Sequence, residues 1–486
     1  MPIIFFLLIN LIIAVLIITR VNTFIRRRKE QIELFSPGII FSVFYFGYYV
    51  LGASFSIFLI GRNYFSSDVV EFFPISSLIS FIGITFFYLG YGLPRSTSHI
   101  YLQRDFFSEA FQDSYRITIF LFLLTWILRF YLISKGIVVS KLFIVANNEG
   151  IDPNEFYLAQ LTTIDRIFWI VNPGIGIFAS LLAYKDALQG KRSKIDRILY
   201  IFIGIEIMYQ LFVLNNRLPA LLLLIYSIPF AVYYKREKLI KIRYILIALV
   251  LWIFVVYPLG QYMRTAAYEY LRYGFTFDNI FENFLPDVIR SYFDEHESSN
   301  SYVFKDDKYV YYRFAPNDFL GNILERIHSE DYKYMYGESY VIELPMLIPR
   351  ILYPGKPEFN TQAEGVIENH YNLPFVDTMT TPMTEAYSNF GVLGVAVVMF
   401  LYGYASNKYW KYFYKNRRDK MLFTIYLYYL YDFYSPEQSL VGGLMMGIRS
   451  ILSLLIIMLL IDKFIFSFFV RKSLKLSNKL VIRELK

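Results

Sequence analysis

The sequence predicts an all-α protein that crosses a membrane many times. Of its 486 residues, 56% are hydrophobic and 20% aromatic, and the mean hydropathy is +0.41. Soluble domains usually carry more charged and fewer apolar residues. Apolar runs long enough to cross a bilayer, about 20 residues, recur along most of the chain. Basic residues gather between these runs in a regular alternation. Composition, run length and charge alternation together predict a polytopic membrane bundle.

Eleven apolar runs are candidate membrane spans. They are residues 3–20, 38–60, 75–93, 117–134, 167–184, 198–214, 218–234, 244–260, 386–405, 421–436 and 441–461. No basic segment precedes the first run and no small-residue cleavage site follows it, so we expect a retained helix rather than a signal peptide. Only Ser435 to Leu440 separate the last two runs, which makes ten or twelve spans the alternative counts.

The basic residues predict the orientation of the spans. One set of connections, together with the tail after residue 461, carries 31 Lys and Arg, whereas the short loops of the other set carry five. Short cytoplasmic loops are enriched in these residues, so we expect the N-terminus outside and the C-terminus in the cytoplasm. Ten spans would place the basic tail outside. The excess of basic residues in the cytoplasmic connections, and their attraction to anionic lipids, account for the net charge of +8. No nucleic-acid partner is needed to explain this charge.

One connection is far longer than the others. Residues 261–385 form a predicted extracytoplasmic loop between helices 8 and 9, with twenty acidic and ten basic residues and three of the four histidines. Connections of this length without a role are uncommon. The chain then divides into an eight-helix bundle (1–260), the loop domain (261–385), three C-terminal helices (386–461) and a cytoplasmic tail (462–486).

Several chemistries have no support in the sequence. The chain has no cysteine, which excludes thiol nucleophiles, disulfides and cysteine metal sites. No phosphate-binding loop, nucleophile elbow or zinc-protease motif occurs, and no ligand spacing predicts a metal. We therefore expect neither a metal nor a cofactor.

Five cations are predicted to lie near the outer face of the bundle: Arg217, Arg264, Arg350, Lys356 and Arg449. Converging arginines suit a phosphate or diphosphate, because the guanidinium group binds its oxygens bidentately. The alternative for each is an interfacial anchor or an ion-pair partner. In "IPRILYPGKPEF" (348–359), the prolines restrict the backbone that presents Arg350 and Lys356.

Glu385 and His370 are the candidate general bases. Glu385 stands at the entrance of the ninth span, where a carboxylate also favours a helix N-terminus, so a simple helix-start role is the alternative. His370 is its rival, together with His328, because histidine titrates near neutral pH. Arg129 and Glu206 are expected to pair structurally within the bundle. Gly443 and Gly447 are best explained by helix packing.

Four segments carry a resemblance to a known family. In chain order they are "NNRLPALLLL", "QYMRTAAY", "YGESYVIELPMLIPRILYPGKPEF" and "TPMTEAYSNFGVLGVAVVMFLYGY". The sequence resembles the Wzy-type polymerases of bacterial oligosaccharide repeat units, the O-antigen polymerases. The most specific parts are the P-R-x-L-x-P-x-K-P pattern, with Tyr353 where tryptophan is common, and the E-A-Y-x-N-F-G segment. Motifs cover roughly residues 200–410, and topology covers the whole chain.

The resemblance implies a glycosyltransferase with a bundle of the multi-spanning, GT-C-like class in a bacterial cytoplasmic membrane. A glycan on undecaprenyl diphosphate would be transferred to another lipid-linked repeat unit, for O-antigen, capsule or exopolysaccharide. Fixed cations can stabilise the diphosphate leaving group without a metal. A base must take the proton of the attacking hydroxyl. Besides membrane lipids, a chain-length regulator is a candidate partner.

Three other functions remain as alternatives. An O-antigen ligase would differ in its acceptor. A transferase that uses a singly phosphorylated lipid–sugar usually has an acidic pair in the first outer loop, where this chain offers Asp68 and Glu71. A lipid-linked oligosaccharide transporter would show internal repeats and broken helices, which the sequence does not display.

Overall fold

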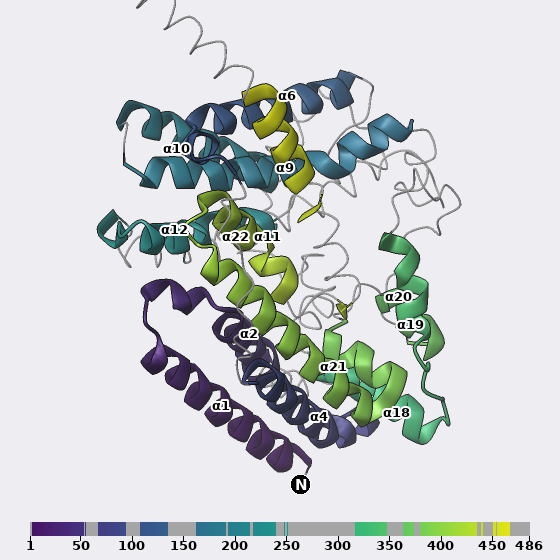
Figure 1. Cartoon of the computed structure of the whole chain (residues 1–486). Coiled ribbons are helices and arrows are strands. Elements are labelled where there is room, and N and C mark those ends of the chain that lie inside the picture. The colour runs from purple at the N-terminus through teal and green to yellow at the C-terminus, as the bar shows by residue number, and fades with distance from the viewer. Residues whose placement is uncertain are drawn as a thin grey trace, which may run out of the picture. The chain divides into compact units, whose positions relative to one another are not determined.

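The computed structural model describes most of the helical parts of the chain. The described residues are 2–52, 54, 67–93, 107–134, 162–190, 193–213, 217–239, 247, 250, 316–347, 363–373, 380–434, 439–440, 451–452 and 454–466. Within these ranges, every regular secondary-structure element is a helix (Figure 1). This confirms the predicted all-α class.

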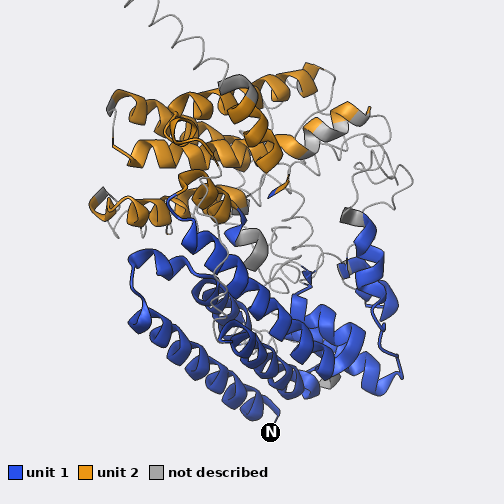
Figure 2. Cartoon of the chain, viewed as in Figure 1, with its two compact units in different colours: residues 1–103, 306–418, 429–451 blue, residues 104–305, 419–428, 452–486 orange. Residues whose placement is uncertain are grey.

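Contacts divide the chain into two compact units (Figure 2). Unit 1 comprises Met1–Gln103, Asp306–Arg418 and Tyr429–Ile451, and unit 2 comprises Arg104–Lys305, Asp419–Tyr428 and Leu452–Lys486. Each unit thus joins segments that are far apart in the sequence. The division in chain order given above concerns position relative to a membrane and stays a prediction.

Four of the described helices are long and apolar enough to cross a membrane. They are α1 (Pro2–Arg27), α4 (Ser67–Tyr91), α6 (Tyr115–Ser134) and α21 (Pro382–Lys415). Each coincides with a predicted run. A membrane protein with several apolar helices is therefore supported, whereas the count of eleven spans stays a prediction.

Other predicted runs are helical but shorter or richer in charge. These helices are α2 (Pro37–Phe46) with the π-helix η2 (Gly47–Gly52), α9 (Thr163–Leu188), α10 (Ser193–Met208) with the π-helix η3 (Tyr209–Val213), α11 (Arg217–Ile225), α12 (Ser227–Tyr233) and α22 (Lys420–Tyr434). The chain breaks between α11 and α12 because Pro229 has no N–H to donate to the carbonyl of Ile225. The runs 244–260 and 441–461 lie mostly outside the described residues.

In unit 1, α4 and α21 approach very closely (Figure 1). A side chain at Gly90 would clash with the backbone of Phe400, and one at Gly403 would clash with the backbone of Phe87. Small residues at such crossings let helices associate where lipid supplies no hydrophobic drive. Phe41 of α2 stacks on Phe87 with ring centroids 3.9 Å apart, so α2 joins the same core.

Polar contacts join helix ends within unit 1. Arg417, after α21, pairs with Glu30 at 2.7 Å, and the Tyr414 hydroxyl donates to Glu33 of the short helix η1 (Gln31–Phe35) over 3.1 Å. At the other end of α21, the Tyr49 hydroxyl donates to Thr381 over 2.7 Å. Both ends of α21 are thus joined to the N-terminal part of unit 1, one to the connection after the first predicted span and the other to Tyr49 in the second.

The predicted outer loop contains helices that pack into unit 1. The α18 helix (Pro316–Ser329) buries Phe319, Leu320 and Ile323 and packs against α4. The Ser80 hydroxyl of α4 donates to the side-chain oxygen of Asn317 over 2.9 Å. The helices α19 (Glu338–Glu343), η8 (Leu344–Leu347) and α20 (Ala363–His370) follow.

In unit 2, α6, α9 and α10 pack together and enclose a charged pair. Arg129 of α6 and Glu206 of α10 are both buried, and two bonds of 2.9 and 2.8 Å join the guanidinium to the carboxylate. A side chain at Gly176 of α9 would clash with both groups. The predicted structural pairing of Arg129 and Glu206 is therefore present.

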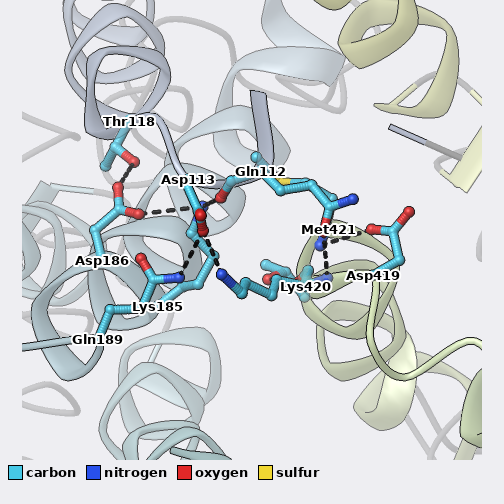
Figure 3. Close-up of polar contacts among 10 residues, drawn as sticks. Gln112, Asp113, Thr118, Lys185, Asp186, Gln189, Asp419, Lys420 and Met421 are labelled. Atoms are coloured by element: carbon cyan, nitrogen blue, oxygen red, sulfur yellow. Dashed lines mark hydrogen bonds and ion pairs between the residues drawn. The ribbon is translucent and has the colours of Figure 1, made fainter. Parts of the chain in front are cut away.

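Polar side chains also connect α9 to the short helix α5 (Glu109–Gln112) in unit 2 (Figure 3). The buried Lys185 ammonium donates to the Gln112 carbonyl over 2.6 Å and lies 3.1 Å from Asp186. Asp186 in turn accepts a hydrogen bond from Thr118. Lys185 and Asp186 thus form a buried ion pair within this network.

The start of α22 joins the same network (Figure 3). Asp419 accepts the N–H groups of Met421 and Leu422 over 3.0 Å each, which caps the first turn of α22. Lys420 pairs with Asp113. At a neighbouring point, Asp462 of η10 (Ile461–Phe466) accepts from the Ser108 hydroxyl over 2.8 Å.

Candidate active site

The candidate site forms where α21 begins and bends. Thr381 caps the helix by accepting the N–H of Thr384 over 3.0 Å, and Pro382 occupies the first turn, where its missing N–H costs nothing. The helical path breaks at Gly391, whose φ of 64° and ψ of −154° suit glycine. The first turns of α21, which carry Glu385, therefore form a separate short segment before the long apolar part.

The segment before α19 satisfies backbone groups that the bend leaves free. The bend deprives the carbonyls of Ser388 and Asn389 of their helical partners. The N–H groups of Met335 and Tyr336 donate to these two carbonyls over 3.0 Å each, and the Tyr371 hydroxyl donates to Ser388 over 3.0 Å. The bend is thus held by chain segments that precede α21 in the sequence.

Glu385 is fully buried, and both of its carboxylate oxygens accept hydrogen bonds. The Ser339 hydroxyl of α19 donates to Oε1 over 3.3 Å. The backbone N–H of Leu440 donates to Oε2 over 2.7 Å. The residue does lie in the first turn of its helix, as the helix-start interpretation requires. Its carboxylate, however, accepts hydrogen bonds from Ser339 and Leu440, which belong to other segments. The helix-start interpretation does not explain these contacts.

A second buried carboxylate, that of Glu343 at the end of α19, lies beside the first. Its Oε1 accepts the N–H of Ala363 over 2.6 Å, and the Ser439 hydroxyl donates to its two oxygens over 3.0 and 3.2 Å. Ser439 and Leu440 are consecutive, so one short segment contacts both glutamates.

Asn389 connects the two helices that carry the glutamates. Its amide donates to the Ser339 hydroxyl over 2.7 Å and to the Glu385 carbonyl over 2.8 Å, and its oxygen accepts the N–H of Gly337 over 2.9 Å. The Ser339 hydroxyl receives a hydrogen bond from Asn389 and is left to donate its own proton to Glu385. The orientation of one carboxylate oxygen is thus fixed by two neutral side chains.

Tyr340 lies next to both carboxylates. Burial, and then the charges of Glu385 and Glu343, raise the pKa of its hydroxyl above the ordinary value, so it stays protonated. The hydroxyl oxygen is buried and finds no hydrogen-bond partner among the described residues. The ring stacks on Phe390, with centroids 6.2 Å apart.

His370, the rival base, ends α20. Its Nε2 lies 2.9 Å from the Lys333 carbonyl, which can only accept, so this nitrogen carries a hydrogen. In the neutral ring Nδ1 is then the acceptor, and a Glu338 oxygen lies 3.9 Å from it. His328 instead places Nδ1 2.8 Å from the Leu324 carbonyl of its own helix. That contact occupies His328 structurally.

The predicted cations are less well defined by the structure. Arg217 is the first residue of α11. Arg264, Arg350, Lys356 and Arg449 lie outside the described residues. Their predicted role at a diphosphate stays a prediction. Within the described ranges, acidic and histidine side chains form no group of three that would hold a metal ion.

Sequence reasoning singled out Glu385 but missed Ser339, Glu343 and Asn389, although all three stand in the segments that carried the resemblance. A signal was present. Ser339 and Glu343 are four residues apart, as are Glu385 and Asn389, and this spacing puts both members of each pair on one helix face. Two polar pairs within apolar helices are an unusual pattern, and here the two faces meet.

The arrangement can accept a proton and hold a hydroxyl group. Glu385 is held by fixed donors, and a positioned carboxylate can act as a general base. Tyr340 supplies a protonated hydroxyl beside two acceptors. Comparison of the chain with protein-family models, with curated proteins and with solved structures found no match.

Proposed function

We propose that this protein is a membrane glycosyltransferase that polymerises oligosaccharide repeat units carried on undecaprenyl diphosphate. The observation that carries the proposal is the meeting of two segments, "YGESYVIE" (336–343) and "EAYSNFG" (385–391). Both segments resemble those of repeat-unit polymerases, and in the structure they form one buried site through Ser339, Glu343, Glu385 and Asn389. This site stands at the end of α21, a helix fit to span a membrane.

The contacts between connecting segments support the proposed topology. Arg417 and Glu30, which pair within unit 1, belong to connections placed on the cytoplasmic side by their charges. Lys420 and Asp113, which pair within unit 2, belong to two such connections as well. Thr381 and Tyr49 meet at the opposite end of their helices. In the proposed orientation, Glu385 and Glu343 lie near the outer face and the N-terminus is outside.

In the proposed reaction, an acceptor sugar hydroxyl attacks the anomeric carbon of the donor glycan. The bond between this carbon and the diphosphate oxygen breaks, and the lipid diphosphate leaves with the electron pair. Glu385 takes the proton of the attacking hydroxyl. Arg217, Arg264, Arg350, Lys356 and Arg449 are the proposed cations for the leaving diphosphate.

Deletion of the gene tests the function itself. We expect single repeat units to remain at the cell surface or on the lipid carrier while the long polymer disappears on gels of surface glycans. Long polymer that accumulates on the carrier without reaching its final acceptor would indicate a ligase. An unchanged ladder would reject both functions and favour a transporter or another role.

Complementation of the deletion strain tests the base. Glu385→Gln keeps the size of the side chain and removes its basicity, so we expect no long polymer although the protein is present in the membrane. His370→Ala is the test of the rival: loss of polymer in this variant alone would transfer the role to His370. Arg217→Ala and Arg350→Ala should also abolish long polymer, and normal chain length in both would remove the proposed diphosphate contacts.

A further inference from the structure

The side of α21 that faces away from the core is apolar and continues past the bend. Leu393 is 74% exposed and Val397 51% exposed. These residues are four apart, so they share one face of the helix. Because α21 is long and apolar enough to cross a membrane, this exposed face would be its lipid-facing side. Phe390, on the other side of the bend, is also exposed.

The α19 helix extends this apolar surface. Gly337, Val341 and Leu344 are spaced at i, i+4 and i+7 and so share one face. Gly337 lies against the ring of Phe390. Val341 and Leu344 are 64% and 46% exposed. We call Val341, Leu344, Phe390, Leu393 and Val397 the α19–α21 strip.

We propose that the α19–α21 strip is one continuous bilayer contact, with α19 lying in the interfacial region of the membrane. The occupant is lipid because the strip is continuous with the lipid-facing side of a membrane helix. Tyr336, just before α19, is exposed as well, and tyrosine is enriched at membrane–water interfaces. Charged residues precede this point: Glu330, Asp331 and Lys333 are exposed. Glu338, the first residue of α19, is also exposed, so the exposed residues of α19 are apolar only from Val341 onward.

The proposal has a consequence for the candidate site. Ser339 and Glu343 are the buried residues of α19, and Val341 and Leu344 are exposed. An α19 helix on the membrane surface would therefore hold the carboxylates of Glu343 and Glu385 just inside the protein, at the level of the lipid headgroups. If the proposed function is right, this is the depth at which a lipid diphosphate presents its sugar. The membrane contact itself does not depend on the reaction.

Site-directed spin labelling tests the contact in reconstituted lipid bilayers. The chain has no cysteine, so single-cysteine variants need no other change. Val341→Cys and Leu344→Cys carry the test labels. Leu393→Cys is the lipid-exposed reference and Lys333→Cys the aqueous one. All four positions are exposed, so the label should not disturb the fold.

We expect labels at residues 341 and 344 to collide with oxygen more than with a water-soluble nickel chelate, as the label at residue 393 does. The label at residue 333 should show the reverse. Collision ratios at 341 and 344 that match residue 333 would overturn the proposal. Dipolar broadening between labels on different molecules would also overturn it, because a second copy of the chain would then cover the strip.

Discussion

The two units both bury carboxylates, but they compensate for the burial differently. In unit 2, Glu206 receives two hydrogen bonds from one arginine, and the rings of Trp126 and Tyr209 flank the guanidinium with centroids 4.8 and 3.6 Å from its carbon. In unit 1, the described hydrogen bonds to Glu385 come from a serine hydroxyl and a backbone N–H. In an ion pair of the first kind, the two charges neutralise each other and the pair links two helices. Neutral donors of the second kind hold a carboxylate in a fixed orientation.

The difference also lies in which segments supply the contacts. The Arg129–Glu206 pair joins two neighbouring apolar helices. The Glu385 site joins α19, the start of α21 and residues 439–440, which stand far apart in the sequence. The bend at Gly391 depends on amides near residue 335. A site of this kind requires the folded unit, whereas the ion pair requires only the three neighbouring helices that enclose it.

The largest effect on stability is expected from Arg129→Met. Removal of one partner leaves the other charge buried, which costs about 3–5 kcal/mol. The double variant Arg129→Met/Glu206→Met should recover much of this loss, because no charge then remains. Chemical unfolding in detergent measures both. Arg417→Met is the matched control: it breaks a solvent-facing pair with Glu30 and should cost less than about 1 kcal/mol.

Gly391→Ala should destabilise unit 1 by about 1–3 kcal/mol, because alanine strongly disfavours a positive φ. The new methyl group would also press on the Tyr334 ring, 3.0 Å away. Gly204→Ala in α10 is the control. It has open space and an ordinary helical backbone, so it should be neutral or stabilise the protein by up to about 1 kcal/mol. If the two variants unfold at the same temperature, the bend does not require glycine at residue 391.

Ser339→Ala should have a modest structural effect and a selective functional one. It removes two hydrogen bonds, one to Glu385 and one from Asn389, each worth about 1 kcal/mol, and frees one oxygen of Glu385 to turn. We expect polymer synthesis in membranes to fall roughly tenfold, which is the equivalent of about 1.4 kcal/mol. Ser388→Ala, which removes a bond of 2.9 Å to Thr384 on the same helix, should leave synthesis near the wild-type rate. A similar loss in both would mean that the serine does not orient Glu385.

The sequence predicted the helical class and eleven apolar spans, four of which coincide with described helices long and apolar enough to cross a membrane, because both features follow from local periodicity and length. It also predicted the pairing of Arg129 with Glu206, whereas the role of Glu385 as a base stays a prediction. The partners Ser339, Glu343 and Asn389 were missed, because their roles depend on two faces that meet only in the folded unit. The burial of one face of α18 on α4 has the same origin. A long hydrophilic connection gives little indication of which of its short helices will pack.

The basic residues show a different kind of gap. Their charge could be read from the sequence, and so could the expectation of a phosphate ligand. Whether these side chains converge on one ligand depends on the fold. Arg217 begins a described helix, and the other four lie outside the described residues, so their role stays a prediction.

The central claim is that Glu385 acts as a general base in the proposed reaction, whereas Glu206 stabilises the fold. The most direct test compares Glu385→Gln with Glu206→Gln, measuring repeat-unit extension per folded molecule in membranes. We predict that Glu385→Gln folds normally but loses roughly 100- to 10,000-fold in rate. Glu206→Gln should yield less folded protein, with each folded molecule near wild-type activity. Full activity in Glu385→Gln, or a rate loss confined to well-folded Glu206→Gln, would contradict the account.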